Sequence, residues 1–128
     1  MSSATGPFTV VVADDAEELR SIIIKLLKRD SRINVVGEAS ETITAIEAVM
    51  HYRPDVLLLD LSMPNGGGIR VLEKIKEESL PTRVVVLSGL PKEHGMYSAG
   101  KSGAHSYLEK GSSFHEIIEF VIKAATDV

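Results

Sequence analysis

The sequence predicts an α/β fold, with a doubly wound, open parallel sheet. Two observations indicate this class: five short runs are rich in Val, Ile and Leu, and each is followed by a segment with helical spacing of apolar residues. Strict alternation of strands and helices places right-handed crossovers on both faces of such a sheet. The 128 residues fit one domain with a sizeable core.

The five expected strands have nearly continuous apolar runs, which is typical of parallel strands covered on both faces. They are Thr9–Asp14, Ile33–Ala39, Asp55–Asp60, Arg83–Ser88 and Ala104–Lys110. Several of these segments end in a charged or hydroxyl side chain.

The first helix is expected from Asp15, because Asp15 and Glu18 have the spacing of a capping box. Its packed face is expected to hold Leu19, Ile22, Ile23, Leu26 and Leu27. The second helix is expected to begin at Ser40 as its N-cap and to end before Pro54. Its inward residues are expected to be Ile43, Ile46 and Met50.

The third helix is expected over Gly67–Glu78, with Val71, Leu72 and Ile75 turned inward. A short fourth helix is expected over Pro91–Ser102, which contains two glycines and few large apolar residues. Ser113 and Glu116 have the spacing of a capping box and open the last helix. Its packing face is expected to hold Ile117, Ile118, Val121, Ile122 and Ala124.

Composition argues against several functional classes. The formal net charge is -4 and the basic residues are scattered, so direct nucleic-acid binding by this chain is not expected. No apolar run is long enough for a membrane span and the N-terminal residues lack a signal pattern, which favours a cytoplasmic chain without a membrane anchor. The absence of cysteine excludes disulfides and thiolate chemistry.

Polar side chains lie at the carboxyl ends of four of the five expected strands. Asp14 and Asp15 lie at the end of the first strand, Asp60 of the third, Ser88 of the fourth and Lys110 of the fifth. Each alone also fits an ordinary role, such as a helix cap, a turn residue or a solvated lysine. Ligands of open parallel sheets bind outside the carboxyl ends of the strands, and the joint placement of these five groups therefore favours a site at that edge.

The residue types at this edge suit phosphoryl transfer. Three carboxylates held close together repel one another unless a cation lies among them, and oxygen-only ligands favour Mg²⁺. A carboxylate in such a site can attack phosphorus and form an aspartyl phosphate. The Lys110 ammonium and the Ser88 hydroxyl can bind phosphoryl oxygens.

The chain resembles the response-regulator receiver domains (CheY-like) of two-component signalling from about Thr9 to Ala125. Four motifs carry the resemblance: "ADD" at 13–15, "LLLDLSMP" at 57–64, "VVVLSG" at 84–89 and "GAHSYLEK" at 103–110. The resemblance implies a flavodoxin-like sheet with strand order 2-1-3-4-5. It also implies a receiver domain at residues 9–125 between short tails at 1–8 and 126–128.

The resemblance assigns a role to each polar residue at the sheet edge. It makes Asp60 the phosphoacceptor, Ser88 the switch hydroxyl, Lys110 the phosphate-binding ammonium and Tyr107 the aromatic switch residue. The implied Mg²⁺ ligands are Asp14, Asp15, Asp60 and the backbone carbonyl of Ser62. Gly111 departs from the family pattern, since many receivers have proline after the lysine, where it favours a cis peptide bond.

The resemblance also implies partners. A histidine kinase or a phosphotransfer protein would supply the phosphoryl group, and the chain would act as a phosphoacceptor and not as an enzyme. Phosphorylation would change the face made by the fourth helix, fifth strand and fifth helix, which binds an output protein or output domain. A phosphorylation-dependent homodimer is also compatible with this. The segments "KGSS" and "VVVLSG" resemble receivers that precede a helix-turn-helix domain, so the chain is either a stand-alone receiver or part of a longer regulator.

Two alternatives use the same residues differently. A receiver-like interaction module that is never phosphorylated would not need the complete set of acidic, hydroxyl and ammonium groups. A haloacid-dehalogenase-like phosphatase would place its nucleophile after the first strand in an Asp-x-Asp arrangement, whereas Asp15 is followed by Ala16 and Glu17.

Overall fold

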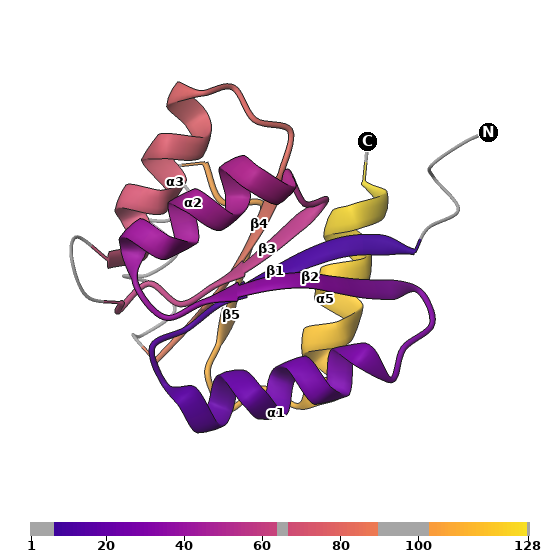
Figure 1. Cartoon of the computed structure of the whole chain (residues 1–128). Coiled ribbons are helices and arrows are strands. Elements are labelled where there is room, and N and C mark those ends of the chain that lie inside the picture. Colours follow the sequence, from indigo (N-terminus) through magenta and orange to yellow (C-terminus); the bar gives the residue numbers. More distant parts are fainter. Residues whose placement is uncertain (1–6, 64–66, 90–102, 128) are drawn as a thin grey trace.

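The computed structural model describes residues 7–63, 67–89 and 103–127. These residues form one sheet of five parallel strands in the order β2-β1-β3-β4-β5 (Figure 1). The strands are β1 (Phe8–Ala13), β2 (Ile33–Ala39), β3 (Val56–Leu59), β4 (Arg83–Ser88) and β5 (Ser106–Glu109). The predicted parallel sheet and its strand order are confirmed.

Helices cover both faces of this sheet (Figure 1). One face packs against α1 (Glu17–Lys28) and α5 (Phe114–Thr126), and the other packs against α2 (Thr42–Tyr52) and α3 (Gly67–Glu77). The predicted helix over Pro91–Ser102 lies outside the described residues. No helix among the described residues is long and apolar enough to cross a membrane.

The central strand β3 is buried on both faces. Val56 and Leu58 belong to the apolar core under α1 and α5, whereas Leu57 and Leu59 belong to the core under α2 and α3. None of these four side chains is more than 2% exposed. Asp60 directly follows this strand, and its backbone N–H donates to the carbonyl of Ala13 at 2.9 Å. The position of Asp60 is therefore fixed by the packed core and by the neighbouring strand β1.

An N-cap was predicted for three of the described helices, and two of these three predictions differ from the structure. The predicted capping box at Asp15 and Glu18 is wrong, because Ala16 is the N-cap of α1 and makes no side-chain capping hydrogen bond. The predicted N-cap at Ser40 is also wrong, since α2 begins one residue later than expected, after Glu41. The capping box of Ser113 and Glu116 at the start of α5 is confirmed.

Two of the predicted packing faces are rotated about the helix axis. Ile22 is 46% exposed and Ile43 is 56% exposed, so neither faces the core as expected. Three consecutive isoleucines at 22–24 leave the phase of α1 ambiguous in the sequence, and the structure buries the second and third. In α2 the buried residues are Thr42, Ala45 and Val49, whose smaller side chains lie between the helix and the sheet.

The start of α3 packs directly on the peptide that follows Asp60. The Gly68 N–H donates to the carbonyl of Leu61 at 2.9 Å. A Cβ atom at Gly68 would lie 2.8 Å from the Asp60 carbonyl oxygen and 2.8 Å from the Leu61 Cα. Glycine is required here because the backbone of the two segments leaves no room for a side chain.

We expect Gly68→Ala to destabilise the protein by about 1–3 kcal/mol, because the added methyl group forces backbone apart. Urea denaturation would measure the change in unfolding free energy. Gly89→Ala is the matched control, since a methyl group at position 89 would have no atom of the described residues within 4 Å. Its effect should stay within about 0.5 kcal/mol. Equal losses in the two variants would contradict this account of Gly68.

Candidate functional site at the carboxyl edge of the sheet

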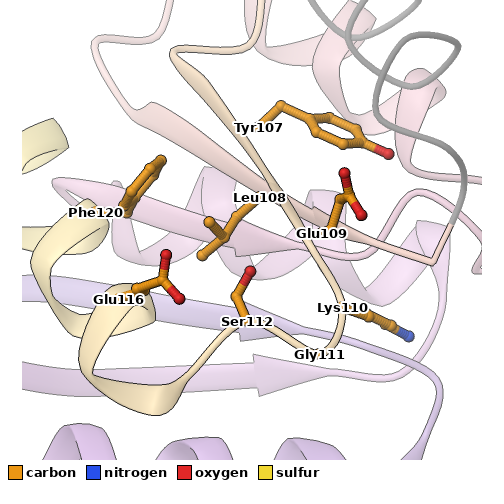
Figure 2. Close-up of a pocket in the computed structure, with 8 residues that line it drawn as sticks. All are labelled: Tyr107, Leu108, Glu109, Lys110, Gly111, Ser112, Glu116 and Phe120. Carbon is orange, nitrogen blue, oxygen red and sulfur yellow. The ribbon is translucent and has the colours of Figure 1, made fainter.

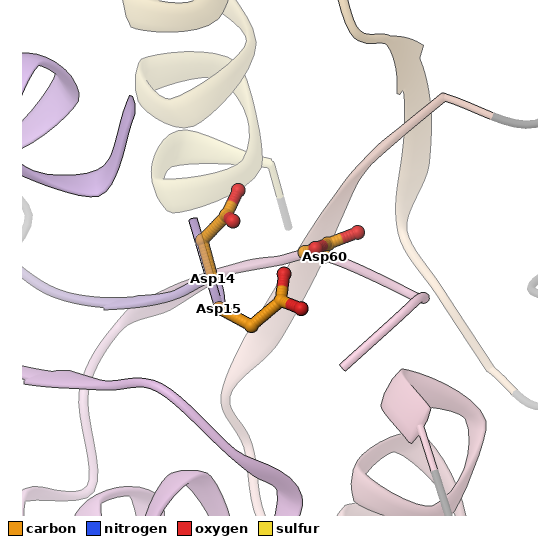
Figure 3. A group of neighbouring side chains, drawn as sticks. All are labelled: Asp14, Asp15 and Asp60. Carbon is orange, nitrogen blue, oxygen red and sulfur yellow. The ribbon is translucent and has the colours of Figure 1, made fainter. Parts of the chain in front are cut away.

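Three carboxylates meet where β1 and β3 end. Asp14 and Asp15 follow β1, and Asp60 follows β3, the adjacent strand (Figure 3). Each offers one oxygen atom, and the three atoms lie within 4.8 Å of one another. Asp14 and Asp60 are only 2% and 1% exposed, whereas Asp15 is exposed to solvent. The structure thus brings together the three acidic residues singled out in the sequence.

Lys110 supplies a positive charge to the buried pair. Its Nζ lies 3.2 Å from Asp60 Oδ2 and 3.5 Å from Asp14 Oδ2. The Lys110 backbone N–H donates to the carbonyl of Ser88 at 2.7 Å, which ties the end of β5 to the end of β4. Residues from four strand ends therefore converge at one place.

The pKa values at the site reflect two opposing effects, burial of the charged groups and attraction between Lys110 and the carboxylates. Burial, together with the nearby charge of Asp60, raises the pKa of Asp14 above its usual value, although hydrogen bonds and Lys110 act in the opposite direction. Burial alone lowers the pKa of Lys110, but the carboxylates of Asp60 and Asp14 outweigh it and the net pKa is raised. Lys110 is therefore charged at neutral pH and partly compensates the acidic residues.

Ser62 contacts Asp60 through two donors that were not expected from the sequence. The Ser62 N–H and hydroxyl both donate to Asp60 Oδ1, at 3.0 and 2.8 Å. Asp side chains in turns commonly accept hydrogen bonds from the residue two positions later. The Asp-x-Ser spacing was therefore the sequence signal for these two contacts. Ser62 thus orients the carboxylate, with Oδ1 toward its own loop and Oδ2 toward Lys110.

The two predicted switch residues lie on neighbouring strands. Ser88 is the last residue of β4 and is fully buried. Tyr107 lies in β5, pairs with Val86 of β4, and is 7% exposed within the core under α2 and α3. After Lys110, Gly111 has a φ of 102°, a conformation closed to proline, which explains the absence of proline at this position.

The donor set at this edge fits a hard divalent cation. It consists of carboxylate oxygens without His or Cys, as Mg²⁺ prefers. The carboxylates of Asp14 and Asp60 are buried, and the Lys110 ammonium contacts both of them. A second positive charge would relieve the remaining repulsion between Asp14, Asp15 and Asp60.

The family profile of the response regulator receiver domain matches residues 10–122. The chain belongs to the response regulator receiver domain family. Among curated relatives, the receiver domain is 37% identical over 119 residues to the nitrate/nitrite response regulator protein NarL of Escherichia coli K12. This match covers 93% of the present chain and 55% of NarL, so the chain spans about half the length of that relative.

A second curated relative and two solved structures show the same similarity. The receiver domain is 40% identical over 92 residues to a protein-glutamate methylesterase/protein-glutamine glutaminase of Gluconobacter oxydans, a match that covers 72% of this chain and 26% of that protein. The receiver domain of NarL from Mycobacterium tuberculosis superposes with a TM-score of 0.90 at 35% identity, covering 94% of this chain and 98% of that one. The response regulator domain of Thermotoga maritima CheB superposes with a TM-score of 0.85 at 28% identity, covering 94% and 98%.

We expect Asp14→Asn to stabilise the metal-free receiver domain by about 0.5–2 kcal/mol, because functional sites commonly hold destabilising groups. Because folding raises the pKa of Asp14, the folded protein loses stability as the pH rises from the unfolded-state pKa through the folded-state pKa of this group. At neutral pH this loss is present in the unchanged protein, and asparagine removes it. The substitution keeps an acceptor for the Ala16 N–H, which donates to Asp14 Oδ1 at 2.8 Å. Urea denaturation at pH 7 with a chelator would measure the effect.

Asp30→Asn serves as the control with the opposite sign. The hydrogen bonds from Arg32 lower the pKa of Asp30 to about 2, so ionised Asp30 stabilises the fold slightly. Loss of stability in both variants would contradict the expected cost of burying the ionised Asp14 carboxylate.

Proposed function

We propose that this receiver domain accepts a phosphoryl group on Asp60. The observation that supports the proposal best is the position of its carboxylate: it is buried at the end of the central strand, with Oδ2 3.2 Å from the Lys110 ammonium and within reach of two further carboxylates. A buried carboxylate next to a cation site is suited to attack phosphorus.

In the proposed reaction an Asp60 carboxylate oxygen attacks the phosphorus of a phosphohistidine. The new P–O bond forms as the P–N bond breaks, and the histidine nitrogen takes the electron pair of that bond. Lys110 binds a phosphoryl oxygen, and the Ser88 hydroxyl donates to another. Ser62 keeps the carboxylate oriented through its two hydrogen bonds to Oδ1.

Mg²⁺ is the proposed cofactor, held by Asp14, Asp15, Asp60 and the backbone carbonyl of Ser62. When bound, it would neutralise negative charge on the phosphoryl group and on the three carboxylates. The donor set supports this assignment, because it contains only oxygen atoms and includes an exposed carboxylate, that of Asp15, which a hydrated ion can reach.

The proposed output face lies beside the phosphorylation site. A cavity of about 440 Å³ between β5 and the start of α5 is lined by residues that include Lys110, Tyr107 and Phe120 (Figure 2). Because Lys110 contacts Asp60 and also lines this cavity, a charge change at Asp60 acts directly on the wall of the cavity. We propose that Tyr107 and Ser88 transmit the change and that the face formed by the predicted fourth helix, β5 and α5 binds an output protein or domain.

The wider biological setting is proposed from the family. A histidine kinase or a phosphotransfer protein of the cytoplasm would supply the phosphoryl group to a receiver domain at residues 9–125. NarL is about twice as long as this chain and contains a similar domain together with further segments. The proposed face could bind either an output domain or a second copy of the phosphorylated chain. Turnover of an external substrate by this chain is not part of the proposal.

We expect incubation with Mg²⁺ and acetyl phosphate to add one hydroxylamine-labile phosphoryl group, and Asp60→Asn to abolish this addition, because the amide is not a nucleophile toward phosphorus. Intact-mass spectrometry would measure the adduct. Asp30→Asn, a substitution at a distant carboxylate, should leave it unchanged.

An adduct that persists in Asp60→Asn would place the phosphoacceptor elsewhere. Complete absence of an adduct in the unchanged protein would favour an interaction module that is not phosphorylated. Steady release of phosphate from unrelated phosphoesters would instead favour a phosphatase.

A further inference from the structure

Arg20 joins the acidic site to the edge of the sheet, although it is not among the residues that the family resemblance assigns. Its side chain is 13% exposed and comes from the start of α1. Nη1 donates to the backbone carbonyl of Asp14 at 2.7 Å, and Nε donates to Glu38 Oε1 at 2.8 Å. One guanidinium group therefore links the β1–α1 loop to β2.

The loop held by Arg20 is the one that carries two of the three acidic residues. The Asp14 N–H donates to the Ala39 carbonyl at 3.0 Å, and Asp14 Oδ1 accepts from the Ala16 N–H at 2.8 Å. With Arg20 on the carbonyl, every polar group of Asp14 except Oδ2 has a backbone or guanidinium partner, and Oδ2 faces Lys110. The hydrogen bond from the Ala16 N–H, two residues later in the same loop, thus sets the direction of the Asp14 carboxylate.

The orientation of the Asp15 carboxylate depends on this loop even more than that of Asp14. Within residues 7–63, 67–89 and 103–127, no hydrogen bond or ion pair holds the Asp15 carboxylate. Its oxygen nevertheless lies within 4.8 Å of those of Asp14 and Asp60. The peptide that joins Asp14 to Asp15 includes the carbonyl that Arg20 binds, so Arg20 restrains the orientation of Asp15 through the backbone.

A bulge in β2 brings Glu38 to Arg20. The pairing of β1 and β2 shifts by one residue: Val10 pairs with Val35, but Val11 pairs with Gly37. Val36 packs into the core under α2 and α3, and a Cβ at Gly37 would contact Tyr52 of α2, so two successive positions face the same side. Glu38 consequently faces α1, where it meets Arg20. Bulges often redirect a side chain next to a functional site.

We propose that Arg20 is a positioning residue for the cation site, and that Glu38 and the β2 bulge hold it in place. The inference rests on the proposed Mg²⁺-dependent function and adds the group that aligns its acidic loop. Groups that support metal ligands typically alter metal affinity by about 10–100-fold when they are removed. Because Arg20 acts on the backbone of the ligands, the effect should lie near the lower end of that range.

The sign of the effect separates positioning from simple charge. If Arg20 acted only as a nearby positive charge, Arg20→Met would make Mg²⁺ bind more tightly, since it removes repulsion between two cations. If Arg20 positions the loop, the same substitution weakens Mg²⁺ binding. Arg20→Lys keeps the charge, but a single ammonium group lacks the planar fork that binds Asp14 and Glu38 together.

The test is a titration of the metal-free protein with MgCl₂, followed by the NMR shifts of the Asp14, Asp15 and Ala16 amides. We expect the Kd for Mg²⁺ to rise about tenfold in Arg20→Met and at least about threefold in Arg20→Lys. Arg32→Met is the matched control, because Arg32 also binds carboxylates, those of Asp30 and Glu119, but lies at the amino end of the sheet. Its Kd should equal that of the unchanged protein.

Unfolding free energies of all variants, measured with a chelator present, would show whether stability and Mg²⁺ affinity change separately. A Kd in Arg20→Met and Arg20→Lys that matches the Arg32→Met control, or that falls, would overturn the positioning role. Absence of saturable shifts in the unchanged protein would overturn the proposed Mg²⁺ site itself, and with it this inference.

Discussion

The contact of the Lys110 ammonium with the buried carboxylates of Asp60 and Asp14 is the interaction on which the rest of the site depends. Two ionised carboxylates that are nearly inaccessible to water repel each other and are costly to bury without a cation. In the sheet, β3, β4 and β5 follow one another on the same side of β1. This order brings Lys110, at the end of β5, to the acidic residues, and its Nζ lies 3.2 Å from Asp60 Oδ2 and 3.5 Å from Asp14 Oδ2. Parallel strand order, and not local sequence, therefore places the compensating charge. The same contact connects the acidic site to the cavity beside β5.

Much of this arrangement could be predicted from the sequence because strand runs and their terminal residues are local patterns. Continuous apolar runs identified the five strands, and the carboxyl ends of parallel strands share one edge, so Asp14, Asp15, Asp60, Ser88 and Lys110 were expected together. The structure places all five at strand ends on that edge. The strand order itself came from the resemblance, since alternation alone permits several orders.

The features that could not be predicted from the sequence are set by tertiary contacts. The phase of α1 among its three isoleucines, and the start of α2 after Glu41, depend on how closely each helix approaches the sheet. The two hydrogen bonds from Ser62 to Asp60 have a local signal, but Arg20 has none, because its partner Glu38 faces α1 only through a bulge in β2. Such a register shift is invisible in a single strand taken alone.

Chemical mapping of the acyl phosphate would test the central claim most directly. Borohydride reduces an aspartyl phosphate to homoserine, so a protein treated with acetyl phosphate and Mg²⁺, reduced and digested, records the modified residue in its peptide masses. The account predicts homoserine at position 60 and unmodified aspartate at positions 14 and 15. Homoserine at position 14 or 15, or at any other acidic residue with Asp60 intact, would contradict it.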